Sequence, residues 1–322
     1  MTGRPTDRSG EGRTLVDRVP AAGPHEDEPQ QSHDSSRHGP VAQLLIAWSP
    51  LSAILVAYWV AQWITAPLGT GDGADTNRIG ARLHVLGPAR GDEALLGTVP
   101  SVWLQERLVD GSTHWWDAVA AVVYITHFVT IPLITAVVWF RLRERFGEWL
   151  TAVLTMSLLG IATYLVYPAA PPWLASDRGD IGTVDRISHV GWEHLGLDAV
   201  ARLVELGQSG SNPVAAMPSL HAGAALLAAL FLWRSVRWVG RALLAAYALA
   251  MAATLVHTGE HYVVDVLAGW LVASLGALAA HGVRRRRDRC AWTSVARVPP
   301  GDRTARPSGA RPPGGRRIGE AS

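Results

Sequence analysis

Residues 257–287 read HTGEHYVVDVLAGWLVASLGALAAHGVRRRR, and this stretch decides the fold. Its middle part, residues 263–283, is apolar apart from Asp265 and His281. A helix needs about 20 such residues to cross the hydrocarbon core of a bilayer. The run ends at four consecutive arginines, residues 284–287. Because arginine next to a span marks the cytoplasmic side, the sequence predicts a membrane-spanning helix that ends in the cytoplasm.

Comparable apolar runs occur earlier in the chain and raise the predicted number of spans to six. They occupy residues 41–65, 118–140, 150–167, 215–233 and 238–257. The composition agrees, since 48% of the residues are hydrophobic and only 17% are charged, against about a quarter in soluble domains. The predicted fold is therefore an all-α membrane protein, a six-transmembrane-helix bundle with extracytoplasmic loops and interfacial helices.

The polar ends and the short connections define domains and orientation. Residues 1–40 are predicted to be a disordered cytoplasmic segment, residues 41–283 the membrane domain, and residues 284–322 a disordered tail rich in Arg, Pro and Gly. Arginines also gather in the short connections after the second and fourth runs, at Arg141, Arg143, Arg145, Arg234, Arg237 and Arg241. All these basic flanks fall on the side of the termini, which predicts an integral cell-membrane protein with both termini in the cytoplasm.

Two long loops, residues 66–114 and 168–213, fall on the opposite, extracytoplasmic side. The first contains the apolar pieces 81–86 and 99–104, which indicate a half-buried lid or a re-entrant segment. In the second, residues 192–206 have the spacing of an amphipathic helix lying at the membrane surface. Its apolar positions are Leu195, Val200, Leu203, Val204 and Leu206.

Ionisable residues next to spans are costly and therefore mark candidate functional sites. They gather on the extracytoplasmic side, with His221 in MPSLHAG and with His257, Glu260, His261 and Asp265 in HTGEHYVVD. His261 and Asp265 are four residues apart, which places them on one helical face. The carboxylate supports His261 as a nucleophile or base, and His221 can then supply a proton to a leaving group. This pattern suits displacement at phosphorus without a metal or other cofactor.

Several chemistries are excluded or unsupported. All 29 basic residues are arginine, so no lysine chemistry is available. The single cysteine, Cys290, rules out an internal disulfide and a multi-cysteine metal site. Neither a phosphate-binding glycine loop nor a dinucleotide fingerprint is present, and no basic groove indicates a nucleic-acid partner.

The motifs Pro218-Ser219-Leu220-His221 and His261-x3-Asp265, on six spans, resemble the type-2 phosphatidic acid phosphatase superfamily. The leucine in the first motif, TYLVYPAAPPW at 163–173 and PSVWLQERL at 100–108 look most like its inositol phosphorylceramide synthase-like branch. The resemblance implies a lipid phosphate as substrate and a phosphohistidine at His261, with Asp265 orienting this nucleophile. It also implies His221 as general acid and Ser219 against the phosphate. A water acceptor makes such an enzyme a phosphatase and an alcohol makes it an inositolphosphotransferase-like enzyme; both remain open.

Two features depart from the family pattern. Thr254-Leu255 stands where the family has Ser-Arg, and the family's Lys-x6-Arg-Pro motif cannot occur in a chain without lysine. Phosphate charge has to be matched by donors in a dry site. His257, one turn before His261, is therefore a candidate phosphate-binding residue, and Arg178 and Arg186 are alternatives.

A zinc peptidase and a protein without catalytic activity are the two competing interpretations. His257-x-x-Glu260-His261 matches the pattern of inverted zinc peptidases, in which both histidines bind zinc and the glutamate is the base. The missing phosphate-site Lys and Arg also leave room for a silent membrane scaffold or a transporter.

His127, in mid-span without an obvious acidic partner, is predicted to be a buried polar contact between helices.

Overall fold

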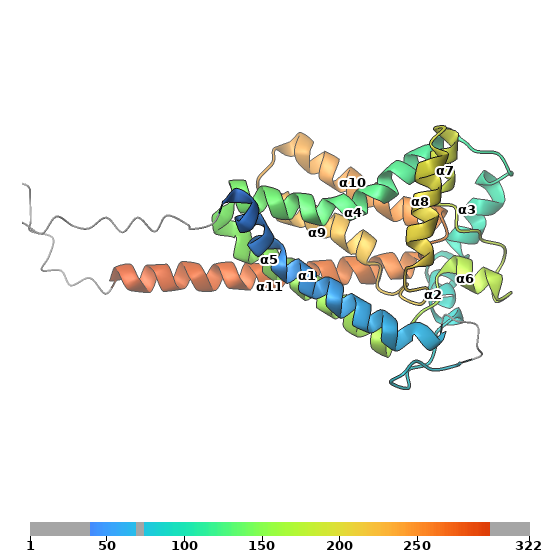
Figure 1. Cartoon of the computed structure of the whole chain (residues 1–322), viewed down its shortest axis with the longest axis horizontal. Coiled ribbons are helices and arrows are strands. Elements are labelled where there is room, and N and C mark those ends of the chain that lie inside the picture. Colours follow the sequence, from blue (N-terminus) through green and yellow to red (C-terminus); the bar gives the residue numbers. More distant parts are fainter. Residues whose placement is uncertain (1–38, 69–73, 297–322) are drawn as a thin grey trace, which may run out of the picture. The chain divides into compact units, whose positions relative to one another are not determined.

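The computed structural model describes residues 39–68 and 74–296, and within these ranges the regular structure is helical, with no strand longer than an isolated bridge (Figure 1). Five of the helices contain segments long and apolar enough to cross a membrane. They are α1 (Pro40–Thr65), α4 (Trp115–Arg141), α5 (Phe146–Val166), α10 (Trp238–His257) and α11 (Val263–Ala296). This confirms the all-α membrane fold with several spanning helices.

The sixth predicted span is shorter than its apolar run. Helix α9 (Leu220–Leu232) has 13 residues, about 20 Å of helix, which falls short of a hydrocarbon core of roughly 30 Å. The run from 215 starts as extended chain, because Ala169 pairs its backbone with Val214 and Ala216. The count is therefore five full-length helices and one short apolar helix within the described residues.

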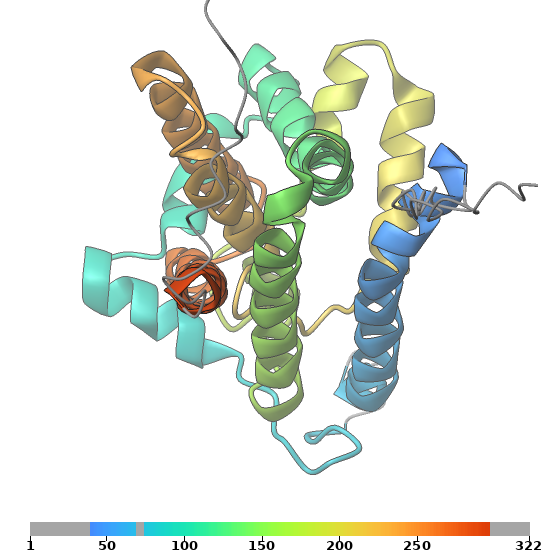
Figure 2. The same cartoon turned by 90° about the vertical axis from the view of Figure 1, so that its left-hand side faces the viewer.

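Helix α11 continues past the predicted end of the last span at 283 and runs to Ala296. The arginine run favours helix, and neither Gly nor Pro interrupts residues 284–296. Viewed from the end, α11 lies beside α5 (Figure 2), and the two helices pack along one another. The rest of the predicted disordered tail, 297–322, and nearly all of the predicted leader, 1–38, lie outside the described residues.

Five short helices gather at one end of the bundle (Figure 1). They are α2 (Leu86–Leu96), α3 (Pro100–Leu108), α6 (Pro172–Asp177), α7 (Val190–His194) and α8 (Asp198–Ser209). The amphipathic helix predicted at 192–206 is in fact two helices, because Gly196 takes a left-handed φ of 70° between them. On α8, Ala201 and Val204 are buried, whereas Leu203 and Leu206 stay exposed. This exposed apolar edge fits an interfacial helix.

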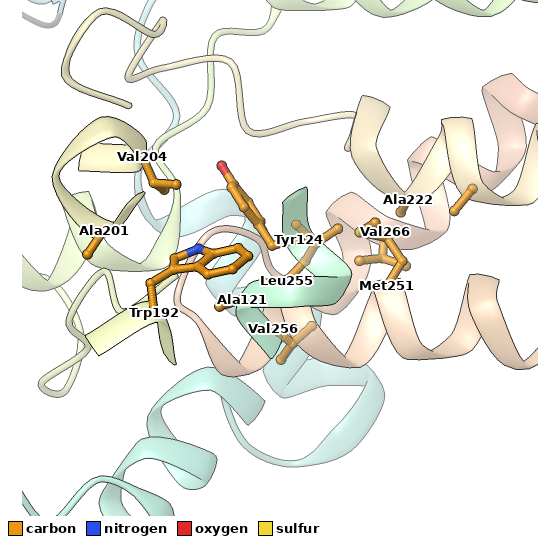
Figure 3. Close-up of a cluster of buried hydrophobic side chains, with 11 residues drawn as sticks. Ala121, Tyr124, Trp192, Ala201, Val204, Ala222, Met251, Leu255, Val256 and Val266 are labelled. Carbon is orange, nitrogen blue, oxygen red and sulfur yellow. The ribbon is translucent and has the colours of Figure 1, made fainter. Parts of the chain in front are cut away.

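Three clusters of buried apolar residues form the core of the described chain, and two of them are large. In the first, Trp149 is fully buried and donates its indole N–H to Thr135 Oγ1 at 2.8 Å. Its ring packs edge to face against Phe231, with the ring centroids 4.9 Å apart. The second surrounds Tyr124, which lies between Trp192 on one side and Met251 on the other (Figure 3). Large apolar side chains remain exposed on the outside of the long helices, as expected of surfaces that face lipid. Examples are Trp59, Leu133, Leu243, Leu271 and Leu278.

Helices α9 and α11 cross at two glycines, and this crossing sets the position of the PSLH motif. A Cβ on Gly269 would lie 2.1 Å from the carbonyl oxygen of Ser219, and one on Gly223 would lie 2.9 Å from that of Gly269. The backbones are therefore in direct contact, and Ser219 N–H donates to the Asp265 carbonyl at 2.9 Å. The start of α9 is thereby held against the start of α11.

Candidate active site

The histidines of the two motifs lie next to each other. His221 is in the first turn of α9, and His261 lies in the loop that joins α10 to α11. Their ring centroids are 5.6 Å apart. The α9–α11 crossing produces this approach, because it holds the start of α9 against the start of α11. Ser219 caps α9 through its side chain, which accepts the N–H of Ala222 at 3.3 Å. The structure thus brings together two residues that are 40 positions apart in the sequence.

Asp265 lies behind His261, as their spacing predicts, although His261 precedes α11 instead of lying within it. His261 Nδ1 is 3.7 Å from Asp265 Oδ2, within ion-pair range but beyond a hydrogen bond. Oδ2 accepts the N–H of Tyr262 at 2.9 Å and so caps α11. Both residues are buried, and His261 Nδ1 and Asp265 Oδ1 have no hydrogen-bond partner within the described part of the chain. Because Nδ1 faces the carboxylate, Nε2 is the nitrogen left to react.

Two aromatic residues of α4 cover the other side of His221. The Tyr124 ring stacks on it at 5.5 Å, and the His127 ring lies 3.9 Å away. The inter-helix contact predicted for His127 is therefore made with a proposed catalytic residue. Tyr124 and the proximity of His127 to the site were not foreseen from the sequence, although three-residue spacing places both on one face of a helix.

His257 is held by an acid that the sequence did not single out. Its Nε2 is 3.1 Å from Asp117 Oδ1, and both side chains are buried. The other oxygen of Asp117 accepts the His114 N–H at 2.9 Å and caps α4. A signal for this role existed, since Asp117 is an acidic residue directly before the predicted span 118–140, where it can cap the start of a helix. Ser219, the second predicted phosphate-binding residue, is fully buried as the cap of α9.

Glu260 and Arg186 form a bidentate ion pair between the α10–α11 loop and the loop before α7. Arg186 Nε and Nη2 each donate to one oxygen of Glu260 at 2.9 Å. Ser188 Oγ at 2.6 Å and Gln208 Nε2 at 3.1 Å add two further donors to Glu260 Oε1. Arg178, the other candidate cation, is half exposed and 4.0 Å from Asp180.

Charge near the site is controlled by burial and pairing. Burial works against the charge of Arg186, but the attraction and hydrogen bonds of Glu260 outweigh it, so the pKa of Arg186 is raised. Asp92 of α2 accepts the N–H groups of Val263 and Val264 at 3.0 and 2.9 Å. Burial raises the pKa of Asp92, and these two bonds only partly offset the rise. The start of α11 is thus capped from a distant helix.

The zinc-peptidase pattern does not form a site in this fold. Helix α10 ends at His257, and Gly259 has a φ of 74°, so the three residues do not share a helical face. His257 turns to Asp117, Glu260 to Arg186 and His261 to Asp265. Among the described residues, no group of three or more His, Cys, Asp or Glu side chains is placed to hold a metal ion. The zinc interpretation is not favoured.

Comparison with known proteins agrees with this geometry. The sequence profile of the PAP2 superfamily matches residues 92–279, more than half of the chain and the part that contains both histidines. The chain belongs to the PAP2 superfamily. This confirms the resemblance drawn from the two motifs, and the membership together with the apolar helices makes the chain a multi-pass membrane protein.

Two curated proteins are similar to part of this chain. The phosphoinositol dihydroceramide synthase of Bacteroides thetaiotaomicron is 27% identical over 194 residues, which cover 55% of this chain and 63% of the relative. The inositol phosphorylceramide synthase of Candida albicans is 28% identical over 137 residues, 37% of this chain and 26% of the relative. The chain therefore spans less than two thirds of either relative. No solved structure matches it significantly.

Proposed function

We propose that this chain transfers a phosphate-containing group from a lipid phosphate through a phosphohistidine intermediate on His261. The observation that carries the proposal is the pair of rings from separate segments, His221 and His261, 5.6 Å apart with Asp265 behind the second. A phosphorus atom held between the two rings is within reach of a nucleophile on one side and a proton donor on the other.

In the first half-reaction, His261 Nε2 attacks phosphorus and the bond to the leaving lipid alkoxide breaks. His221, protonated at the start, gives its proton to that oxygen. In the second, His221 takes the proton of the acceptor hydroxyl while the acceptor oxygen attacks phosphorus and the P–N bond breaks. Asp265 supports the positive charge on His261 in between. Both histidines return to their starting states.

The names of the relatives favour an alcohol over water as acceptor. Both relatives are synthases of phosphoinositol-bearing ceramide lipids by name, so we favour transfer of phosphoinositol to a ceramide-type alcohol. The arginine-rich flanks support a site on the extracytoplasmic face with both termini in the cytoplasm. The phosphate-binding roles of Ser219 and His257 stay predictions, since Ser219 caps α9 and His257 pairs with Asp117.

The test uses membranes that contain the full chain, incubated with phosphatidylinositol and labelled ceramide, and separately with labelled phosphatidic acid and water. His261→Ala and His221→Ala are compared with His194→Ala, a matched change at an exposed histidine at the end of α7. We expect both site variants to lose turnover and His194→Ala to keep it. In a single turnover with donor labelled in the headgroup, acid-labile label should remain on the wild type and be absent from His261→Ala. Full turnover by His261→Ala would overturn the proposal.

Addition of EDTA separates this chemistry from the zinc interpretation. Turnover through a phosphohistidine should survive the chelator, because the proposed steps use only side chains. A loss of turnover with EDTA that zinc restores would favour the peptidase-type site instead. A wild-type chain that turns over none of the lipids would favour a silent scaffold.

A further inference from the structure

The Arg186–Glu260 pair is built asymmetrically. The Glu260 side chain is almost closed off, with 6% of its surface exposed, whereas Arg186 keeps 23%. Ser188 and Gln208 also donate to Glu260, so the carboxylate has more donors than the guanidinium alone supplies. A pair whose only purpose was to hold two segments together would have no need to leave the cation open on one side.

The guanidinium is held rigidly. Its Nε and Nη2 are fixed by Glu260, and its face lies over the Trp173 ring of α6 at 5.2 Å. Of its five N–H groups, two point to Glu260, and Nη1 reaches the Gln208 carbonyl only at 3.5 Å, the limit of a hydrogen bond. The edge formed by Nη1 and the second hydrogen of Nη2 therefore has no charged partner, only the Gln208 carbonyl and the Tyr124 hydroxyl, which a phosphate can replace. An arginine edge of this kind matches two oxygens of a phosphate.

This edge lies beside the two histidines. The Tyr124 hydroxyl adjoins the guanidinium, and the Tyr124 ring stacks on His221 at 5.5 Å. Gln208 joins the ion pair to this ring, since its side chain donates to both Glu260 and the Tyr124 hydroxyl, and Glu260 is the residue immediately before His261. Arg186, His221 and His261 are therefore connected through Tyr124 and Glu260, although they come from three segments of the chain.

A phosphoryl group in a dry site needs a cation near it, and the α10 side of the site supplies none. Leu255 is fully buried in the apolar cluster around Tyr124, and Thr254 bonds the Thr258 hydroxyl through its carbonyl. His257 is already engaged by Asp117. Arg186, which comes from another segment, is joined to the site through Glu260 and through Gln208 to Tyr124.

We propose that Arg186, held in place by Glu260, binds the phosphate of the substrate between His221 and His261. The phosphate contact then comes from the loop before α7, whereas Glu260 is a positioning residue that acts through Arg186. This inference rests on the proposed function, in that it concerns the same site and the same substrate class. Its test measures oxyanion binding separately from turnover.

Orthovanadate is the probe, because in a phosphoryl-transfer site it adopts the trigonal-bipyramidal geometry that phosphorus has during transfer. The purified full chain in detergent micelles is heated with increasing vanadate, and unfolding is followed by the fluorescence of its tryptophans. We expect vanadate to protect the wild type, and Arg186→Gln to need about 10- to 100-fold more vanadate for the same protection, as for the loss of charge-assisted hydrogen bonds. Arg202→Gln removes an exposed arginine of α8 and should bind like the wild type.

Arg186→Gln leaves Glu260 buried without its cation and can unfold the chain for that reason alone. The double variant Arg186→Gln with Glu260→Gln removes both charges and keeps side chains able to hydrogen-bond to each other. It should fold and still lose vanadate protection, because the cation that binds the anion is gone. If the double variant binds vanadate as tightly as the wild type, the pair is only structural and the inference is overturned.

Two further outcomes separate this inference from the proposed function. If vanadate protects the wild type but not the Arg186 variants, and the wild type turns over no lipid phosphate, the result would support the anion site and count against the proposed enzyme. A wild type that vanadate does not protect at any concentration would overturn the anion site, even if lipid turnover is measured.

Discussion

Gly269 is the point at which a single methyl group should separate the two segments that carry the proposed catalytic histidines. In the substitution Gly269→Ala, the new Cβ would lie 2.1 Å from the Ser219 carbonyl oxygen and 3.0 Å from the carbonyl carbon. Both atoms belong to the backbone, so no side chain can move away to make room. Helices α9 and α11 must therefore separate locally by about 1 Å to reach the shortest contact that real Cβ atoms make.

This separation acts directly on the chemistry. Ser219 caps α9 and His221 follows two residues later, so the movement carries His221 away from His261. A misplacement of about 1 Å costs on the order of 100-fold in rate. Overpacking of this kind also costs about 1–3 kcal/mol of stability. We expect Gly269→Ala to fold, with a lower unfolding temperature, and to turn over lipid phosphate about 100-fold more slowly than the wild type.

Two other glycines of α11 provide matched controls. A Cβ on Gly276 would lie 2.6 Å from the Ala152 carbonyl oxygen, so Gly276→Ala crowds the α5 contact instead of the site. A Cβ on Gly282 would have nothing within 4 Å, and Gly282→Ala should gain up to about 1 kcal/mol in helix stability. Turnover is measured per folded molecule, with thermal unfolding alongside. Equal activity losses in Gly269→Ala and Gly276→Ala, or full activity in Gly269→Ala, would refute the reasoning.

Three further substitutions test the surroundings of the site. Asp92→Ala should lower stability by about 1–2 kcal/mol in chemical unfolding, because two N–H groups at the start of α11 lose their acceptor. Tyr124→Phe keeps the ring on His221 but loses the hydroxyl next to Gln208, so turnover should fall less than about tenfold; a loss above 100-fold would give the hydroxyl a part in the chemistry. Trp149→Phe breaks the bond to Thr135 and should cost about 1–3 kcal/mol without slowing the folded enzyme.

The parts of the fold that depend on local pattern could be predicted from the sequence. Apolar runs and their arginine flanks give the long helices, because crossing a bilayer requires a minimum length of uncharged helix. His221 and His261 meet because each lies at the same end of a predicted span. The spacing of His261 and Asp265 brings them to 3.7 Å, even though His261 lies just outside the helix.

The contacts that complete the site could not be predicted in the same way. Asp117 and His257 are 140 residues apart, and Arg186 and Glu260 are 74 apart. Which residues pair over such distances depends on the crossing of the helices and on the path of the loops, and neither follows from the period of the apolar residues. The break between α7 and α8 was missed for a related reason, since the amphipathic pattern continues through Gly196.

The buried acids help to distinguish structural groups from reactive ones. Asp117, Glu260 and Asp92 each have donors for both carboxylate oxygens, from His257, from Arg186 and from backbone N–H groups. Asp265 differs, because Oδ1 has no partner among the described residues and Oδ2 lies 3.7 Å from His261 Nδ1, too far for a hydrogen bond. A buried acceptor and a buried imidazole nitrogen left unpaired side by side are costly. An approach of Nδ1–H to the carboxylate would satisfy both groups, and in the proposed reaction the same contact would support the charge on His261.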